Sequence, residues 1–179
     1  MTDGKVIVRL AGGKPRGIAV DKLHLEAQDM SATSVMPVTV SGVVQPVGKF
    51  NLDGRVGPLN QGDSTLTPLE VNLTFENLDV AQSGVVPPSA AIKGVASYSG
   101  VLQSKAGVAS MNGQLKLDKL QVGTNAKPAG RPVELAYHLE HGLTSHIGKL
   151  KESELRSGKA VARFGGTYEL KPQETISGS

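Results

Sequence analysis

The sequence predicts an all-β protein: a curved, twisted antiparallel sheet, built as a β-groove or as a partly open sandwich or barrel, with at most one short helix. Three observations indicate this fold. Apolar and polar residues alternate with a period of two over most of the chain, which is typical of half-buried strands. The 22 glycines and 10 prolines are dispersed and mark many turns. Aromatic residues are only 3% of the chain and Trp is absent, so burial must come from aliphatic side chains, which suit a pleated sheet.

The alternation divides the chain into successive short strands separated by polar breaks or by breaks with Gly and Pro. This spacing is typical of an antiparallel meander rather than of β-α-β units. Helix is expected only as a single turn over 79–83, and the stretch 143–155 is expected to form one or two irregular strands. The other predicted strands cover residues 6–10, 20–25, 38–44, 50–56, 69–75, 95–102, 109–117, 133–139 and 161–170.

A step of two apolar residues and a glycine, each two residues apart, occurs four times. The glycine has the parity of the apolar residues, so it is predicted to lie on their face and to mark a bend, a bulge or a close backbone approach. Alternatively, the Asp-Gly and Asn-Gly pairs in two copies form hairpin turns. We expect continuous strands, because the alternation resumes in phase beyond the glycine. The four copies are Val38-x-Val40-x-Gly42, Phe50-x-Leu52-x-Gly54, Ala109-x-Met111-x-Gly113 and Ala162-x-Phe164-x-Gly166.

A second pattern, apolar-acidic-x-Leu-x-apolar, occurs three times. Across each copy the apolar parity slips by one residue, which is what a β-bulge produces. The sheet is therefore predicted to twist and curl at these three places. The copies are Val20-Asp21-Lys22-Leu23-His24-Leu25, Phe75-Glu76-Asn77-Leu78-Asp79-Val80 and Leu117-Asp118-Lys119-Leu120-Gln121-Val122.

Length and charge set further bounds. The 179 residues predict one domain over 1–170, followed by a flexible tail over 171–179. The net charge of +3 comes from scattered Lys and Arg without runs, so nucleic-acid binding is not expected. Cys is absent, which removes disulfides and thiolate sites. No apolar run reaches the roughly 20 residues of a membrane-spanning helix.

Candidate catalytic and metal-binding groups are few, and each has a simpler interpretation. His138 and His141 would face opposite sides of a strand, which argues against a shared metal site with His146. The segment 97–100 (Ser-Tyr-Ser-Gly) lacks the spacing of a nucleophile elbow, and the glycine-rich segment 12–17 is expected to be a hairpin loop. We therefore expect no enzyme, no metal and no cofactor. The carboxylates expected on the outward face are Asp53, Glu70, Asp118 and Glu134.

Six segments, taken in order, resemble the C-terminal region of AsmA-like proteins of bacterial envelopes. The resemblance runs from about residue 49 to 170, and the strands before it are of the same type. The segments are "KFNLDGRVGPLN", "LTPLEVNLTFENLDVAQSG", "AIKGVASYSGVLQS", "ASMNGQLKLDKLQVG", "GRPVELAYHLEHGL" and "SGKAVARFGGTYEL".

The family is similar to the bridge-like lipid transfer proteins, and the resemblance implies a periplasmic module of a protein anchored in the inner membrane. It implies a role in phospholipid handling and outer-membrane assembly through an apolar groove that binds acyl chains. Two alternatives stay open: the apolar face is an ordinary covered core, or the domain is a structural module that contacts neighbouring domains through its edge strands. The residues that the resemblance suggests for the groove lining are Leu73, Phe75, Leu115, Leu117, Phe164 and Tyr168.

Overall fold

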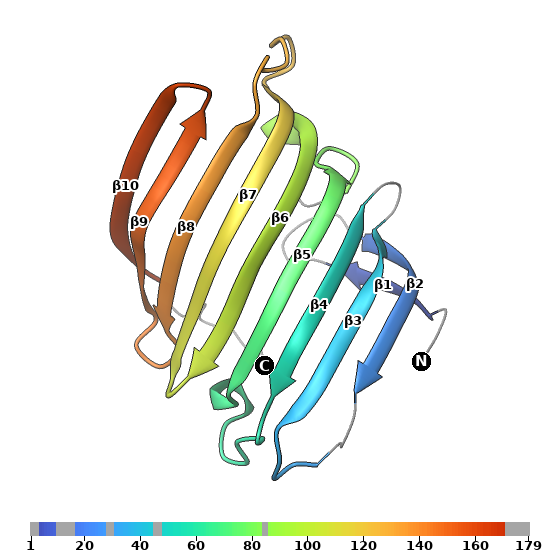
Figure 1. Cartoon of the computed structure of the whole chain (residues 1–179), viewed down its shortest axis with the longest axis vertical. Helices are drawn as coiled ribbons and strands as arrows, with labels where there is room; N and C mark the ends of the chain where they lie inside the picture. Colours follow the sequence, from blue (N-terminus) through green and yellow to red (C-terminus); the bar gives the residue numbers. More distant parts are fainter. Residues whose placement is uncertain (1–3, 10–16, 28–30, 45–47, 84–85, 171–179) are drawn as a thin grey trace, which may run out of the picture.

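The protein is a single antiparallel β-sheet of ten strands that pair in chain order, as the alternation predicts. A computed structural model describes residues 4–9, 17–27, 31–44, 48–83 and 86–170. The sheet is not closed into a barrel, and Figure 1 shows the strands side by side from β1 to β10. The strands are β1 (Gly4–Arg9), β2 (Gly17–Ala27), β3 (Met36–Val44), β4 (Lys49–Val56), β5 (Leu69–Asp79), β6 (Ile92–Lys105), β7 (Val108–Val122), β8 (Val133–Gly142), β9 (Ile147–Ser157) and β10 (Ala160–Glu169).

Helical structure in the described residues is limited to two single turns of 3-10 helix, η1 (Ser64–Leu66) and η2 (Pro88–Ala90). The predicted turn after β5 is present, because the amide of Ser83 donates to the carbonyl of Asp79 over 2.9 Å. Within the described ranges, no helix has the length and apolar character needed to cross a membrane. The predicted hairpin loop over 12–17 falls mainly in residues 10–16, and that segment and the tail over 171–179 lie outside the described residues.

The strands run through the glycines, so the alternative of hairpin turns at these positions is wrong. β4 continues through Gly54, which pairs with Val71 of β5, and β7 continues through Gly113, which pairs with Gly100 of β6. A Cβ atom added at Gly54 would lie 2.1 Å from the carbonyl oxygen of Glu70. The glycine therefore permits the close backbone approach that its parity predicts.

All three predicted bulges are present, and each has the same backbone conformation. The third residue of the pattern has a left-handed φ: 52° at Lys22, 54° at Asn77 and 53° at Lys119. The strand register shifts at these places, between Asp21 and His24 on β2, between Phe75 and Leu78 on β5, and opposite 93–95 on β7. The extra residue returns the following Leu to the apolar face while the strand bends.

A fourth bulge, at Glu152 of β9, was not predicted. Glu152 has φ 34°, and the register shifts against both neighbouring strands at this point. The residue that follows on the apolar face is Ser153 rather than Leu, so the apolar pattern gives no signal. β9 nevertheless confirms an irregular strand within 143–155.

The pairing aligns residues of equal parity in rows that cross the sheet, so the apolar side chains share one face, here called the apolar face. The opposite side, which carries most of the charged residues, is called the polar face. Successive Cβ atoms point to opposite sides of a strand, so in-register pairing keeps each row on one side. One row across β4–β10 is Phe50, Phe75, Tyr98, Leu115, Leu135, Leu155 and Ala162, and a second is Gly54, Val71, Leu102, Met111, Leu139, Leu150 and Gly166.

The apolar face has no second layer of strands or helices in the described chain. Only five hydrophobic residues of that part are buried: Val71, Leu78, Val80, Ala96 and Tyr98. Leu78, Val80 and Ala96 form a small cluster near one end of β5 and β6. Most other residues of the face are half-buried, shielded mainly by one another, and those of β10 other than Tyr168 are exposed. The architecture is therefore an open, bent sheet rather than a sandwich.

We predict that replacing Lys119 by Gly stabilises the protein. A non-glycine residue with left-handed φ costs about 1–2 kcal/mol, and Gly removes much of this cost. The free energy of unfolding, measured by urea denaturation, should rise by about 1 kcal/mol. The matched control is Gln114→Gly, an exposed residue in a regular part of the same strand, which should lower stability by about 0.5–1 kcal/mol. Equal losses for both variants would contradict the bulge conformation.

Candidate functional site

The register brings all six predicted groove residues to the apolar face. Leu73 pairs with Gly100, and Phe75 and Leu115 both pair with Tyr98 from opposite sides. Leu117 pairs with Ala96 and Val133. Phe164 and Tyr168 lie on β10, three strands away from β7 or about 14 Å. The structure thus places the six residues on one surface in two groups, and whether they bind lipid stays a prediction.

The two groups differ in burial. Phe75, Leu115 and Leu117 pack against the buried cluster of Leu78, Val80 and Ala96, so they also hold the fold together. On the edge strand Phe164 is 45% exposed. It pairs with Ser153, which is fully buried and donates its hydroxyl to the carbonyl of Lys151. A ligand on this face would therefore contact well-packed side chains at the centre of the sheet and more exposed side chains at its edge.

Tyr98 forms the floor at the centre of the apolar face. Its ring lies over the paired glycines Gly100 and Gly113, where an added Cβ atom would lie 2.2 Å and 2.5 Å from the tyrosine oxygen. The ring stacks on Phe75 with centroids 5.2 Å apart. On the other side its hydroxyl is 3.0 Å from that of Tyr137 on β8. The glycines thus make room for a flat aromatic layer that spans β5–β8.

Sequence reasoning missed Tyr98 and Tyr137, although a signal was present. Ala96-x-Tyr98-x-Gly100 is a fifth copy of the apolar-apolar-glycine step, with an aromatic residue in second place. Burial raises the pKa of Tyr98 above its ordinary value of 10.0, and the hydrogen bond to Tyr137 adds to this. Both effects favour the neutral phenol, which suits an apolar surface.

One end of the apolar face is polar, and we call it the polar end: Ser104, His141 and Tyr168. These residues belong to one row, which crosses β6–β10 through Ala109 and Gly148. His141 and Tyr168 stack with centroids 5.7 Å apart, and an added Cβ at Gly148 would lie 2.1 Å from the Tyr168 ring. The Ser104 hydroxyl and Nδ1 of His141 are buried without a hydrogen-bond partner. Such atoms are costly unless another polar group satisfies them.

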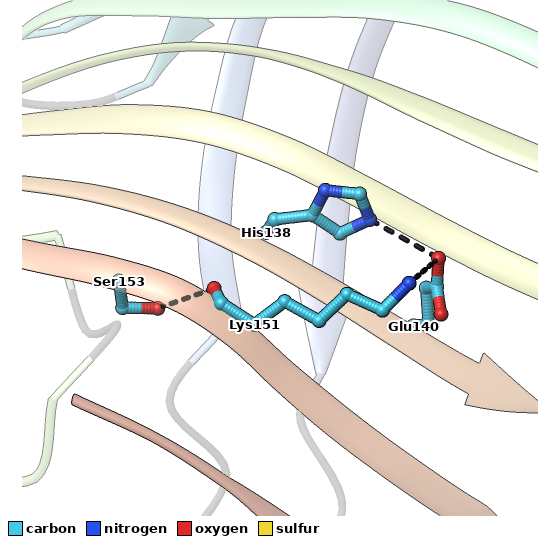
Figure 2. A network of polar contacts seen from close by, with 4 residues as sticks. All are labelled: His138, Glu140, Lys151 and Ser153. Atoms are coloured by element: carbon cyan, nitrogen blue, oxygen red, sulfur yellow. Dashed lines mark hydrogen bonds and ion pairs between the residues drawn. The ribbon is translucent and has the colours of Figure 1, made fainter.

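The polar face carries ion pairs between adjacent strands. Figure 2 shows Glu140 of β8 between Lys151, whose Nζ is 2.5 Å away, and His138, whose Nε2 is 3.3 Å away. The hydrogen bond from Lys151 lowers the pKa of Glu140.

The sheet is curved. In Figure 2, which is seen from the polar face, the pale ribbons of β1 and β2 pass behind β8 and β9 at a steep angle, and in Figure 1 β1 passes behind β2. The sheet therefore curls toward its apolar face.

Two hollows, of about 490 and 550 Å³, lie over the polar face of β5–β9. Two of the charged groups that line the first hollow, Glu154 and Arg156, are paired with each other. In the first hollow Glu154 accepts hydrogen bonds from Arg156 over 2.6 Å and from Arg163 over 2.9 Å, and these bonds lower its pKa. A carboxylate held in this way is a poor proton acceptor. The hollows are shallow surface features between ion-paired side chains, without a desolvated reactive group.

The geometry of the other candidates agrees with the sequence interpretation. His138 lies on the polar face and His141 on the apolar face, and His146 lies in the turn between β8 and β9. The predicted outward carboxylates lie on the polar face, where Asp53 accepts from Thr39 and Glu70 pairs with Arg55. Over the described ranges, no three His, Asp or Glu side chains are grouped so that they could hold a metal ion.

Comparison of the chain with family models, with curated proteins and with solved structures finds no match. The geometry of the sheet is therefore the basis for any functional assignment.

We predict that Gly113→Ala destabilises the sheet, because the added methyl group would overlap the Tyr98 ring. Overpacking of this kind costs about 1–3 kcal/mol in the free energy of unfolding, measurable by urea denaturation. The control is Gly130→Ala, at a position with no atom within 4 Å of the added Cβ, which should change stability by less than about 0.5 kcal/mol. If Gly113→Ala is as stable as the control, the aromatic layer does not rest on the glycine.

We also predict that Tyr98 makes stability fall at alkaline pH. The folded-state pKa of Tyr98 is raised, so above about pH 10 the unfolded chain releases this proton while the folded chain retains it. The free energy of unfolding of the wild type should then fall by up to about 1.4 kcal/mol per pH unit more than that of Tyr98→Phe. Between about pH 7 and 9 the two curves should run parallel. Parallel curves at every pH would show that Tyr98 is not buried as a neutral phenol.

Proposed function

We propose that this chain is a non-enzymatic lipid-handling module whose apolar face binds the acyl chains of a phospholipid. On this proposal it is part of an AsmA-like protein of the bacterial envelope, anchored in the inner membrane, acting in the periplasm and serving phospholipid transport and outer-membrane assembly. The proposal includes Leu73, Phe75, Leu115, Leu117, Phe164 and Tyr168 as residues that contact the acyl chains.

One observation carries the proposal: a wide apolar face on a ten-stranded sheet without a second layer over it in the described chain. A soluble monomer rarely presents a large apolar patch unless the patch binds something. The face is bent, and apart from its polar end most of its side chains are aliphatic or flat aromatic, so it offers many weak contacts and few directional polar groups. Acyl chains, which have no hydrogen-bonding groups, are the ligands that such a surface suits.

The polar end supports the choice of an amphiphile over a purely apolar ligand. Ser104 lies six residues beyond Tyr98 on β6, about 20 Å along the strand. A lipid whose chains cover the central rows would bring its polar part near the unsatisfied Ser104 hydroxyl and His141 Nδ1. Hydrogen bonds from the lipid would then satisfy buried groups that no protein atom reaches.

The choice of a non-enzymatic role rests on the state of the polar groups. The carboxylates of the polar face, such as Glu140 and Glu154, have lowered pKa values because Lys and Arg donate to them. General acid or base catalysis works best with a group whose pKa is near the working pH. The alternative is a structural module with no lipid ligand, and the open edge at β10 favours it as the second candidate.

The test is lipid uptake by the purified chain. After incubation with phosphatidylethanolamine vesicles and gel filtration, native mass spectrometry and solvent extraction should detect phospholipid bound to the wild type. Leu73→Gln and Phe164→Gln place an amide on the apolar face and should reduce the bound lipid about fivefold or more, since burying a group of this kind without a partner costs about 1–3 kcal/mol. Circular dichroism and urea denaturation verify that each variant is folded.

The matched control is Thr74→Gln, which adjoins Leu73 on β5 but points to the polar face and should leave uptake unchanged. Absence of phospholipid on the wild type under these conditions would rule out the lipid proposal. Equal loss of lipid in the control and in Leu73→Gln would place the lipid elsewhere on the protein.

A further inference from the structure

β10 is the last strand of the sheet, and no other strand of the described chain pairs with its outer side. It pairs with β9 on one side, and all of its residues except Tyr168 are exposed, with Val161 at 43% and Phe164 at 45%. An edge strand presents a row of free backbone donors and acceptors, which proteins usually protect with proline, bulges or inward charges. β10 contains no proline, and the bulge beside it belongs to β9 at Glu152, so β10 keeps a regular alternation.

We infer that two copies of the chain associate through β10, pairing antiparallel about a two-fold axis at Phe164. The axis places Phe164 opposite itself, Ala162 opposite Gly166 and Val161 opposite Thr167 of the second copy. At the ends of the pairing, Lys159 lies opposite Glu169 of the second copy, and the symmetry repeats this ion pair. A two-fold interface of this type is self-complementary, as most dimer interfaces are.

Strand length, parity and charge together favour this register, because an axis at Phe164 pairs residues 160–168 of β10 with the same residues of the second copy. An axis at Gly166 would also keep the parity and would set Arg163 against Glu169, but it places residues 160 and 161 opposite positions beyond the end of β10. An axis between two residues would pair positions of unlike parity and turn the second apolar face to the opposite side of the joined sheet. An axis at Arg163 would place the two Arg163 side chains opposite each other, and like charges in that position are destabilising. An axis at Gly165 would lose both ion pairs and set Val161 against Glu169. Of the axes at Arg163, Phe164 and Gly165, which all keep the parity, the one at Phe164 adds an aromatic cross-strand pair, retains both Lys159–Glu169 ion pairs and sets Arg163 opposite the uncharged Gly165.

The inference does not depend on lipid binding. The joined sheet would present an apolar face of twice the width, but the association arises from backbone hydrogen bonds, one aromatic pair and two ion pairs. An edge contact buries less than the roughly 1,200 Å² of a stable interface, so we expect a weak dimer that depends on concentration. In this dimer β10 pairs with β10 of a second copy, which distinguishes it from the addition of a strand by an unrelated protein.

The first test uses charge reversal, with the dimer fraction measured by sedimentation velocity over a range of concentrations. Lys159→Glu and Glu169→Lys should each raise the dissociation constant about tenfold, because each turns two attractions into two repulsions. The double variant K159E/E169K restores the opposite charges and should return the constant to within about threefold of the wild type. Lys93→Glu, an exposed residue of β6 four strands away from β10, is the control and should have no effect.

The second test uses the absence of cysteine from the chain. Phe164→Cys places two thiols opposite each other across the axis, where cross-strand Cα atoms lie about 4.5–5.5 Å apart, within the reach of a disulfide. Mild oxidation should therefore give a covalent dimer. Val161→Cys lies six residues from its symmetry mate along the paired strands, about 20 Å, and should remain monomeric.

A wild type that stays monomeric at all concentrations, and a Phe164→Cys variant that is not cross-linked faster than Val161→Cys, would overturn the inference. So would a dimer that the single charge reversals leave intact, since this would show association through β1 or through the apolar face. If the protein takes up lipid but does not form this dimer, the proposed function stands and the dimer does not. If it forms this dimer but takes up no lipid, the dimer stands and the proposed function does not.

Discussion

The structure depends on one constraint: each strand must pair with its neighbours so that residues of equal parity stay on the same side. A shift of one residue in any pairing would turn the apolar side chains of that strand to the polar face. The bulges at Lys22, Asn77, Lys119 and Glu152 add one residue where the strands bend. The register shifts against both neighbouring strands at Lys22 and Glu152, and against β6 at Asn77 and Lys119. A single layer has no second sheet to correct an error of register, so the pairing itself must hold the apolar face together.

Glycine solves a second problem of a single-layered sheet. An apolar residue in a two-layered protein is shielded from water by the facing layer, whereas in the described part of this chain it is shielded by its neighbours in the sheet. Tyr98 lies flat over Gly100 and Gly113, and Tyr168 lies over Gly148 against His141. A ring in this position covers glycine backbone that would otherwise be exposed. Few aromatic residues can therefore shield a wide surface, in a chain where they are only 3% of the sequence.

Parity in the sequence predicts most of the fold. The alternation gives the strands, the phase beyond Gly54 and Gly113 shows that the strands continue, and the repeated acidic pattern locates three bulges. The bulge at Glu152 is not predictable in this way, because the residue that follows it on the apolar face is a serine. The change of parity therefore leaves no trace in the pattern of apolar residues. The site is less predictable. Sequence parity brings the six groove residues to one face, but the Tyr98 layer and the polar end arise from side chains that meet across several strands, at distances that only the register defines.

The distribution of polar groups limits how this sheet can interact with other molecules. On the polar face, Glu154 is bonded to two arginines and Glu140 to Lys151, so these groups gain little from a new partner and would have to give up existing bonds to bind one. Any contact that removes water from the apolar face is favourable in free energy, and so is any strand that supplies hydrogen bonds to the edge at β10. The two surfaces select for different partners, since acyl chains cannot satisfy backbone amides and an added strand cannot cover the face. A ligand on the face and a strand at the edge are therefore compatible, and a wider sheet with a longer apolar face would hold more of the same ligand.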